Sequence, residues 1–268
     1  MRVGTDCSGA EAPLWALKQI SQEMHAQMGL DLQLDHVFSC DIMHASRRFI
    51  RTNCRPRALF GDLAARGAVA HCLLAERPRL VPGNLDIYVA GFPCKDFSLL
   101  NHERPGLEGP HASIFHGVVR YIQRHEPRAF VLENVDGLTM ASKGEEAPIH
   151  VVMRILRGIP NYQVRGWKVN TKEFYLPQHR KRVYIVGVHT AKATLRLPLK
   201  QWEPVIGRLE CKPPAGADAF LLGDDEPEVV AEATRLRDHH EERLRSQPFG
   251  SPQRGKKWMR VHRMVRAK

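Results

Sequence analysis

The sequence predicts an α/β fold: one sheet with helices on both faces, followed by a small irregular C-terminal appendage. Short β-rich runs alternate with helical runs from residue 1 to about residue 189. After residue 189 the alternation stops, prolines become frequent and charged blocks appear. Strand–helix alternation of this kind indicates a sheet that is covered by helices on both faces. We therefore expect a main domain over 1–189 and an appendage over 190–268.

The expected strands are short, are rich in Val, Ile, Phe and Tyr, and are bounded by Gly, Pro or Asp. These features are typical of strands in a buried sheet. The predicted strands are Val3–Asp6, Val37–Cys40, Leu85–Ala90, Ala129–Leu132, Gln163–Asn170 and Val183–Val188.

The expected helices lie between these strands and carry apolar residues at helical spacing. Glu11–Met28 has Pro13 near its start, a position that suits proline. Ser113–His125 and Ala147–Arg157 each place their apolar residues on one face. In the appendage, a charged helix is expected over about 228–245.

The charge balance favours a polyanionic partner. The chain of 268 residues has a net charge of +11 and a pI of about 9.6. A basic surface of this size suits nucleic acid, although charge cannot separate DNA from RNA, and a merely soluble basic protein remains the alternative. The last 18 residues, Ser251–Lys268, hold seven Lys or Arg and no acid, which adds a basic tail.

Several classes of protein are disfavoured. The six cysteines form no CxxC pair, so we expect no structural metal site. No run of about 18 apolar residues exists, so we expect no membrane span. The N-terminus does not resemble a secretory leader, and we expect an intracellular protein.

The octapeptide Gly91-Phe92-Pro93-Cys94-Lys95-Asp96-Phe97-Ser98 directly follows an apolar run. Its cysteine would lie just past the carboxyl end of a strand, where open α/β sheets bind ligands. Gly91 and Pro93 favour a tight turn that would hold the thiol in place. A lone cysteine is more often a buried, inert residue; the surrounding octapeptide makes Cys94 a candidate nucleophile.

Two further motifs carry acidic or basic groups that could assist a nucleophilic cysteine. Glu133-Asn134-Val135 follows the expected strand Ala129–Leu132, and a carboxyl at a strand end can donate a proton or can be a solvated cap. Gln178-His179-Arg180-Lys181-Arg182 precedes the last expected strand. It is either a basic turn or a group of cations that would favour a nearby thiolate.

A cofactor site is expected where the first strands end. The turn Thr5-Asp6-Cys7-Ser8-Gly9-Ala10 has small residues that let backbone approach a ligand at a helix start, although the dinucleotide pattern GxGxxG is absent. Asp41-Ile42 and Asp62-Leu63 follow later apolar runs. A carboxylate at the position of Asp41, just after the expected strand Val37–Cys40, is suited to ribose hydroxyls.

Taken in their order along the chain, over residues 1–189, the motifs resemble those of the cytosine-C5 methyltransferase family. The resemblance implies a Rossmann-like methyltransferase sheet, S-adenosylmethionine as cofactor and cytosine in DNA as substrate. It implies that Cys94 attacks C6 of a flipped base, that Glu133 protonates N3, and that Arg180 and Arg182 hold the base and the catalytic loop. The cofactor-binding residues that it implies are Thr5, Asp6, Ser8, Gly9, Ala10, Asp41, Ile42, Asp62, Leu63 and Pro93.

The chain also departs from the family pattern. Lys95 stands where the family usually has Gln, and Glu11 and Ala12 stand where it has glycines. No Gly-Asn motif follows Gly187. Residues 190–268 are therefore expected to be a partial or degenerate target-recognition region with a basic tail.

The expected activity is that of a DNA (cytosine-5-)-methyltransferase. A tRNA cytosine-C5 methyltransferase and a truncated, non-catalytic nucleic-acid-binding relative are the alternatives. We expect the protein in the nucleus if the host is a eukaryote and otherwise in the cytoplasm. Target sequence, maintenance or de novo behaviour, host and oligomeric state stay open.

Overall fold

This computed structural model describes residues 1–93, 112–141, 146–174, 176, 178–210 and 225–245. The chain divides into two compact units, Met1–Pro213 and Pro214–Lys268. Within the described residues, no helix combines the length and the apolar character that a membrane span requires.

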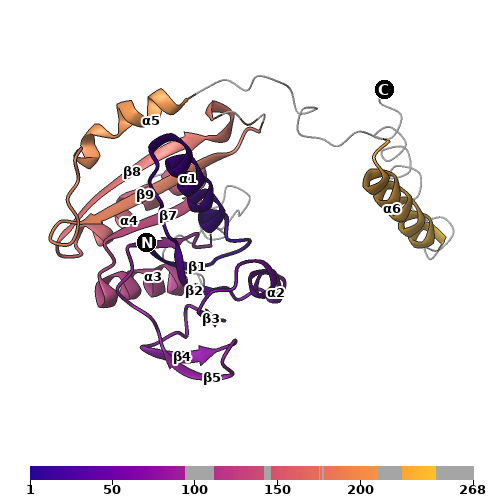
Figure 1. Cartoon of the computed structure of the whole chain (residues 1–268), viewed down its shortest axis with the longest axis horizontal. Helices are drawn as coiled ribbons and strands as arrows, with labels where there is room; N and C mark the ends of the chain where they lie inside the picture. The colour runs from indigo at the N-terminus through magenta and orange to yellow at the C-terminus, as the bar shows by residue number, and fades with distance from the viewer. Residues whose placement is uncertain (94–111, 142–145, 175, 177, 211–224, 246–268) are drawn as a thin grey trace. The chain divides into compact units, whose positions relative to one another are not determined.

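A seven-stranded sheet forms the centre of the first unit (Figure 1). Its order is β3-β2-β1-β6-β7-β9-β8. The pairs from β3 to β7 are parallel, whereas β9 runs antiparallel to both β7 and β8. The strands are β1 (Arg2–Asp6), β2 (Asp35–Cys40), β3 (Ala58–Phe60), β6 (Ile87–Ala90), β7 (Ala129–Val135), β8 (Tyr162–Asn170) and β9 (Lys181–His189).

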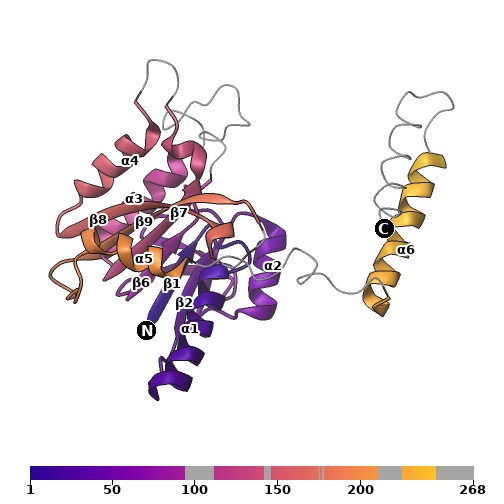
Figure 2. The ribbon, with the colours of Figure 1, turned by 90° about the horizontal axis from the view of Figure 1, so that it is seen from above.

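Helices lie on both sides of this sheet, which confirms the predicted α/β class. In Figure 2, α1 and α2 lie on one side, and α3 and α4 lie on the other. The helices of the first unit are α1 (Ala12–Met28), α2 (His44–Asn53), α3 (Ala112–His125), α4 (Pro148–Arg157) and α5 (Glu203–Leu209). Because both faces are covered, residues of both faces are buried in the parallel strands, as in β1, where Val3 to Asp6 are all buried.

Five α-helices and strands were not predicted from the sequence: α2, β3, α5, and the antiparallel pair of β4 (Val69–Cys72) and β5 (Arg77–Leu80). Helix α2 is rich in polar residues, and only Ile50 in it is buried. Strand β3 has only three residues, and β5 is exposed throughout. An apolar pattern therefore could not reveal these elements.

The first compact unit continues beyond the domain boundary expected at residue 189. After β9, Leu199 is buried, and the indole of Trp202 stacks on that of Trp167 in β8, with ring centroids 5.9 Å apart. Residues up to α5 therefore pack on the sheet, because an aromatic stack joins them to its outermost strand. The role of 190–268 in target recognition stays a prediction.

The described part of the second unit contains helix α6 (Pro227–Arg245), as the sequence predicts. Glu232 and Arg235 form an ion pair on it at 2.6 Å. The basic tail, Ser251–Lys268, lies outside the described residues.

Close packing of the sheet generates a stability prediction for Gly187 in β9. A Cβ added there would lie 2.1 Å from the ring of Phe130, which the two paired strands hold in place. We expect Gly187→Ala to lower the free energy of unfolding by about 1–3 kcal/mol, the usual effect of overpacking a core. Urea unfolding monitored by circular dichroism measures this change.

Gly166 in β8 provides the matched control, because a Cβ added there would meet its nearest neighbours at an ordinary 3.7 Å. Gly166→Ala should leave the unfolding free energy within about 0.5 kcal/mol of its starting value, or raise it. Equal destabilisation by the two substitutions would show that contact with Phe130 is not the cause.

Candidate active site

The predicted site residues gather where the parallel strands reach their carboxyl ends. The turn after β1 holds Ser8 and Gly9, Asp41 follows β2, Gly91 follows β6, and Glu133 lies near the end of β7. In open α/β sheets this edge is the one that binds ligands. Cys94 itself, with the rest of 94–111, lies outside the described residues.

Glu133 lies beside the start of the segment that leads to Cys94. A Cβ added to Gly91 would be 3.6 Å from Glu133 Oε2 and 3.9 Å from the carbonyl oxygen of Cys7. One carboxylate oxygen of Glu133 therefore faces the beginning of this segment.

The residues just before Cys94 are anchored in the protein core. Phe92 is 3% exposed, and its ring packs against that of Phe115 with centroids 5.3 Å apart. The buried side-chain amide of Asn134 donates a hydrogen bond of 3.3 Å to the carbonyl oxygen of Phe92. Asn134 thus joins the Glu-Asn-Val motif to the Pro-Cys segment, a role that the sequence analysis did not assign to it.

Arg182 pairs with the other carboxylate oxygen of Glu133. The antiparallel register of β7 and β9 sets Val135 opposite Arg182, and Arg182 Nε lies 2.8 Å from Glu133 Oε1. Both side chains are partly exposed, at 18% for Arg182 and 30% for Glu133, so solvent reaches the pair. Glu133 consequently has Oε1 toward Arg182 and Oε2 toward Gly91.

Arg180 and Tyr184 complete the surroundings of this pair. Arg180 lies in the exposed turn before β9, where its backbone N–H donates to Asn170 Oδ1 at 3.0 Å. Of the two predicted arginines, only Arg182 forms an ion pair with Glu133 within the part of the chain that the structure describes. Burial raises the pKa of Tyr184, and the charge of Glu133 adds to the rise, whereas the two arginines oppose it.

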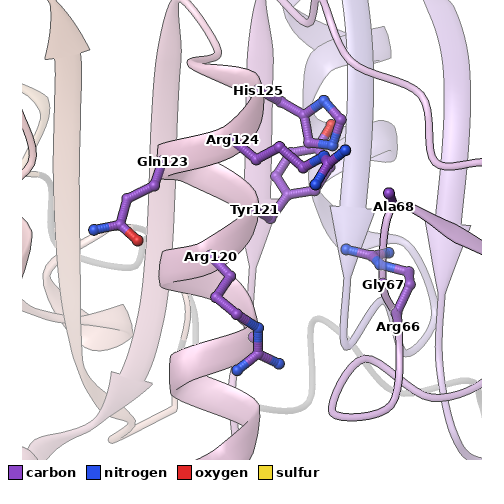
Figure 3. Close-up of a pocket in the computed structure, with 9 residues that line it drawn as sticks. Arg66, Gly67, Ala68, Arg120, Tyr121, Gln123, Arg124 and His125 are labelled. Carbon is purple, nitrogen blue, oxygen red and sulfur yellow. The ribbon is translucent and has the colours of Figure 1, made fainter.

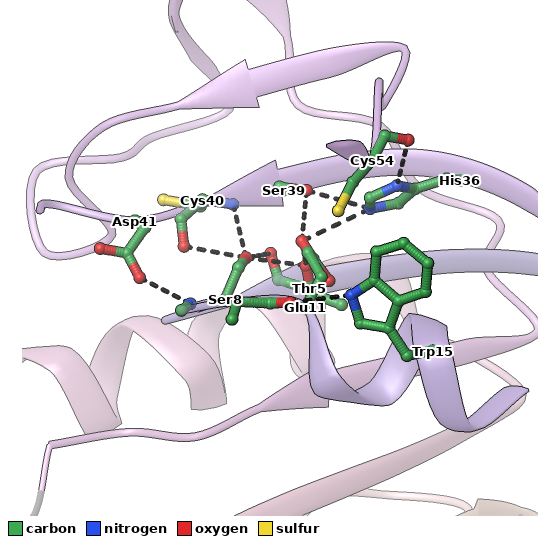
Figure 4. Close-up of polar contacts among 11 residues, drawn as sticks. Thr5, Ser8, Glu11, Trp15, His36, Ser39, Cys40, Asp41 and Cys54 are labelled. Atoms are coloured by element: carbon green, nitrogen blue, oxygen red, sulfur yellow. Dashed lines mark hydrogen bonds and ion pairs between the residues drawn. The ribbon is translucent and has the colours of Figure 1, made fainter. Parts of the chain in front are cut away.

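Asp41 ties together the turns that follow β1 and β2 (Figure 4). Its Oδ2 accepts a hydrogen bond of 2.8 Å from the N–H of Gly9, which has a φ of 53°, and its Oδ1 accepts one of 2.7 Å from Met43. The Ser8 hydroxyl also accepts one from the N–H of Cys40 at 3.1 Å. Each oxygen of Asp41 keeps a second lone pair with which it can accept a ligand hydroxyl.

Glu11, which replaces a glycine of the family pattern, is a fully buried carboxylate in this turn. Its Oε1 accepts hydrogen bonds from the hydroxyls of Thr5 at 2.7 Å and Ser39 at 2.5 Å, and it lies 3.5 Å from His36 Nε2. Its Oε2 has no partner among the described residues. Figure 4 shows these side chains converging on Glu11 from β1 and β2.

The backbone at Glu11 has the left-handed conformation, with a φ of 57°. This conformation disfavours a residue with a Cβ by about 1–2 kcal/mol, whereas glycine adopts it freely. The hydrogen bonds from Thr5 and Ser39 hold Glu11 there. A departure from the family pattern is therefore accommodated by a buried polar network.

The carboxylate of Asp6, a predicted cofactor residue, has its partners inside the core. Its two carboxylate oxygens accept hydrogen bonds from the guanidinium of Arg66 at 2.6 and 2.5 Å, and the hydroxyl of Tyr88 donates a third at 2.5 Å. Asp6 is 1% exposed. Because both oxygens are engaged inside the core, the carboxylate is not free for a ligand, and a backbone contact of Asp6 with the cofactor stays a prediction.

The remaining predicted cofactor residues lie in different environments. Asp62 is exposed, and its Oδ1 accepts a hydrogen bond from the N–H of Ala64. Leu63 is buried against Gly117 of α3, so its side chain belongs to the core. Ile42 is 64% exposed beside Asp41. Ala10 is exposed and Pro93 half-buried.

Cys7 is a second thiol at the same edge. Its pKa is raised to about 12, first by burial and then by the charges of Asp6 and Asp41. The thiolate is the nucleophilic form of cysteine. Cys7 is therefore a poor nucleophile near neutral pH.

Paired substitutions at Glu11 separate the backbone conformation from the hydrogen bonds. Glu11→Ala loses the carboxylate, leaves the Thr5 and Ser39 hydroxyls without their acceptor, and keeps the unfavourable φ. We expect it to lower the unfolding free energy by about 2–3 kcal/mol. Glu11→Gly should be more stable than Glu11→Ala by about 1 kcal/mol, because glycine tolerates this φ. If urea unfolding finds the alanine variant at least as stable as the glycine variant, the strained turn is not a feature of the protein in solution.

Comparison with known proteins gives the family. A family model described as C-5 cytosine-specific DNA methylase matches residues 35–248. The chain is 34% identical over 232 residues to a protein of Cryptococcus neoformans var. grubii named DNA (cytosine-5-)-methyltransferase DMT5, with 85% of this chain and 9% of that protein covered. It is 40% identical over 133 residues to the Type II methyltransferase M.HpaII of Haemophilus parainfluenzae, with 49% and 35% covered.

Among solved structures, the S. pombe Dnmt2 methyltransferase has a TM-score of 0.49 and 15% identity, over 73% of this chain and 51% of that one. The chain spans only 9% and 35% of the length of the two curated relatives. The family model, however, matches most of this chain. The chain belongs to the C-5 cytosine-specific DNA methylase family.

Proposed function

We propose that this chain transfers a methyl group from S-adenosylmethionine to C5 of cytosine in DNA through a covalent intermediate on Cys94. The observation that carries the proposal is the position of Glu133, with Oε1 on Arg182 and Oε2 toward the segment that leads to Cys94. The family supports the reaction class, and the two relatives are named as methyltransferases.

Glu133 would supply a proton to the base. Cytosine C6 is a poor electrophile until N3 is protonated, and a positioned carboxyl group can protonate it. Arg182 orients the carboxyl through Oε1, which leaves Oε2 to face the base. Asn134 holds the backbone at Phe92, two residues before Cys94, and so anchors the segment that carries the proposed nucleophile. The base must leave the duplex to reach these groups.

The turns after β1 and β2 fit S-adenosylmethionine, which supplies an activated methyl group when bound. Asp41 has lone pairs left for the ribose hydroxyls after it accepts the two backbone N–H groups. A Cβ added to Gly9 would meet nothing within 4 Å, so the backbone there is open to a ligand. The exposed Ile42 offers an apolar surface beside Asp41.

Two alternatives are kept. The net charge of +11 suits RNA as well as DNA, so the same chemistry on tRNA is a second candidate. A non-catalytic nucleic-acid-binding relative is the third. The Glu133–Arg182 pair favours an enzyme, because a binding module has no use for a carboxyl aimed at the Pro-Cys segment.

Methyl transfer from labelled S-adenosylmethionine to DNA and to tRNA, measured side by side, tests the proposed activity. We expect incorporation into DNA that Cys94→Ala abolishes and that Glu133→Gln lowers by roughly 10²–10⁴, the usual contribution of a general acid. Glu126→Gln, which changes an exposed acid that pairs with Lys192, is the control and should keep full activity. Incorporation into tRNA alone, or equal loss in both glutamate variants, would contradict the proposal.

Cofactor binding tests the role of Asp41 separately. Asp41→Ala should weaken binding of S-adenosylmethionine by about 1–3 kcal/mol, the cost of leaving a hydrogen-bonding partner unpaired. Asp35→Ala removes an acid from the opposite end of β2, where it pairs with Arg2 and Arg57, and should leave the affinity unchanged. Isothermal titration measures both. The same affinity in the two variants would place the cofactor elsewhere.

A further inference from the structure

A cavity of about 370 Å³ lies between α3 and the segment that follows β3 (Figure 3). Arg120, Arg124 and His125 line it from the last turns of α3, and Arg66 lines it from the opposite side. Helix α3 ends at His125, shortly before β7 begins at Ala129. The last turn of α3 therefore lies toward the amino end of β7, away from the edge that holds Glu133.

Every charged residue that lines the cavity is basic. Arg66 is neutralised by Asp6, whereas no carboxylate pairs with Arg120 or Arg124 in the described part of the chain. Arg120 donates one hydrogen bond, of 3.2 Å, to the carbonyl oxygen of Ala64. The carbonyl end of a helix offsets only about half a unit of positive charge, so two arginines leave the cavity cationic.

His125 reports this positive potential. Its pKa is lowered, first by burial and then by the charges of Arg124 and Arg66. Its ring packs on that of Tyr121 with centroids 4.6 Å apart. A bound anion would offset the positive potential at this ring.

Two residues that line the cavity, Arg66 and Tyr121, are held in place by contacts within the core, whereas Arg120 and Arg124 are exposed. Arg66 is held by both oxygens of Asp6. Tyr121 is 4% exposed, stacks on Tyr88 at 4.4 Å, and donates a hydrogen bond of 2.7 Å to the carbonyl oxygen of Pro82. This part of the site is preformed and loses little free energy to ordering when a ligand binds.

We propose that this cavity binds a phosphate group, with Arg120 and Arg124 as its principal donors. The planar guanidinium has donors spaced to match two phosphate oxygens, and the volume lies in the range of small-molecule sites. The phosphate could belong to a small molecule or to a nucleic-acid backbone. The site is separate from the proposed methyl-transfer site and does not depend on its activity.

Binding of pyrophosphate and of duplex DNA to the full chain tests the site and identifies the source of the phosphate. In Arg120→Gln/Arg124→Gln, pyrophosphate affinity measured by isothermal titration should fall at least about tenfold, the usual effect of losing charge-assisted hydrogen bonds. Arg154→Gln/Arg157→Gln removes the same charge from α4 and should leave the pyrophosphate affinity unchanged. DNA affinity is measured in parallel by fluorescence anisotropy.

A fall for pyrophosphate and DNA together supports a backbone phosphate site, whereas a fall for pyrophosphate alone supports a small phosphate ligand. Unchanged pyrophosphate affinity, or an equal fall in the α4 control, overturns the proposal. A second readout uses sulfate, which stays doubly charged between pH 5 and 8. Saturating sulfate should raise the pKa of His125, as followed by NMR, in the parent chain and not in the Arg120→Gln/Arg124→Gln variant. An unchanged pKa of His125 in the parent chain overturns the proposed site.

Discussion

The buried ion pair between Asp6 and Arg66 is the interaction on which the rest of the first unit depends. It joins the end of β1 to the segment after β3, and the hydroxyl of Tyr88 adds β6 to the same group. The guanidinium also lies over the rings of Phe38 and Tyr121, at 5.1 and 5.3 Å. Removing one partner of such a pair leaves a buried charge, which typically costs about 3–5 kcal/mol. The end of β1 is thereby fixed, and the turn that we propose to hold the cofactor begins at the next residue.

Three further contacts join neighbouring strand ends at the carboxyl edge of the parallel strands. Asp41 couples the turn after β1 to the turn after β2 through backbone N–H groups. Asn134 couples β7 to the backbone before Cys94. The register of β7 and β9 brings Arg182 to Glu133. The first two contacts join the carboxyl ends of neighbouring parallel strands, and the third joins the end of β7 to the start of the antiparallel strand β9. The proposed chemistry therefore rests on strand ends that meet at one edge of the sheet.

Much of the fold could be predicted from the sequence, because its buried strands are short apolar runs and most of its helices carry apolar residues at helical spacing. Helix α2 could not, since a single buried side chain, Ile50, gives no period. A motif match does not say whether an acid at a strand end faces the ligand edge or the core. The pairing of the Asp6 carboxylate with Arg66, 60 residues away in sequence, therefore could not be predicted. Glu11 looked like a lost glycine, and only its contacts with Thr5 and Ser39 explain why the turn accepts it.

We propose that Cys94 is the nucleophile, and trapping the covalent adduct tests this role most directly. DNA that contains 5-fluorocytosine, incubated with the chain and S-adenosylmethionine, should form a stable adduct, because fluorine cannot leave C5 as a proton does. Peptide mapping should place the adduct on Cys94, and Cys94→Ser should abolish it. Cys7→Ser should retain it, since burial raises the pKa of the Cys7 thiol to about 12. An adduct on Cys7, or one that survives Cys94→Ser, would contradict the account.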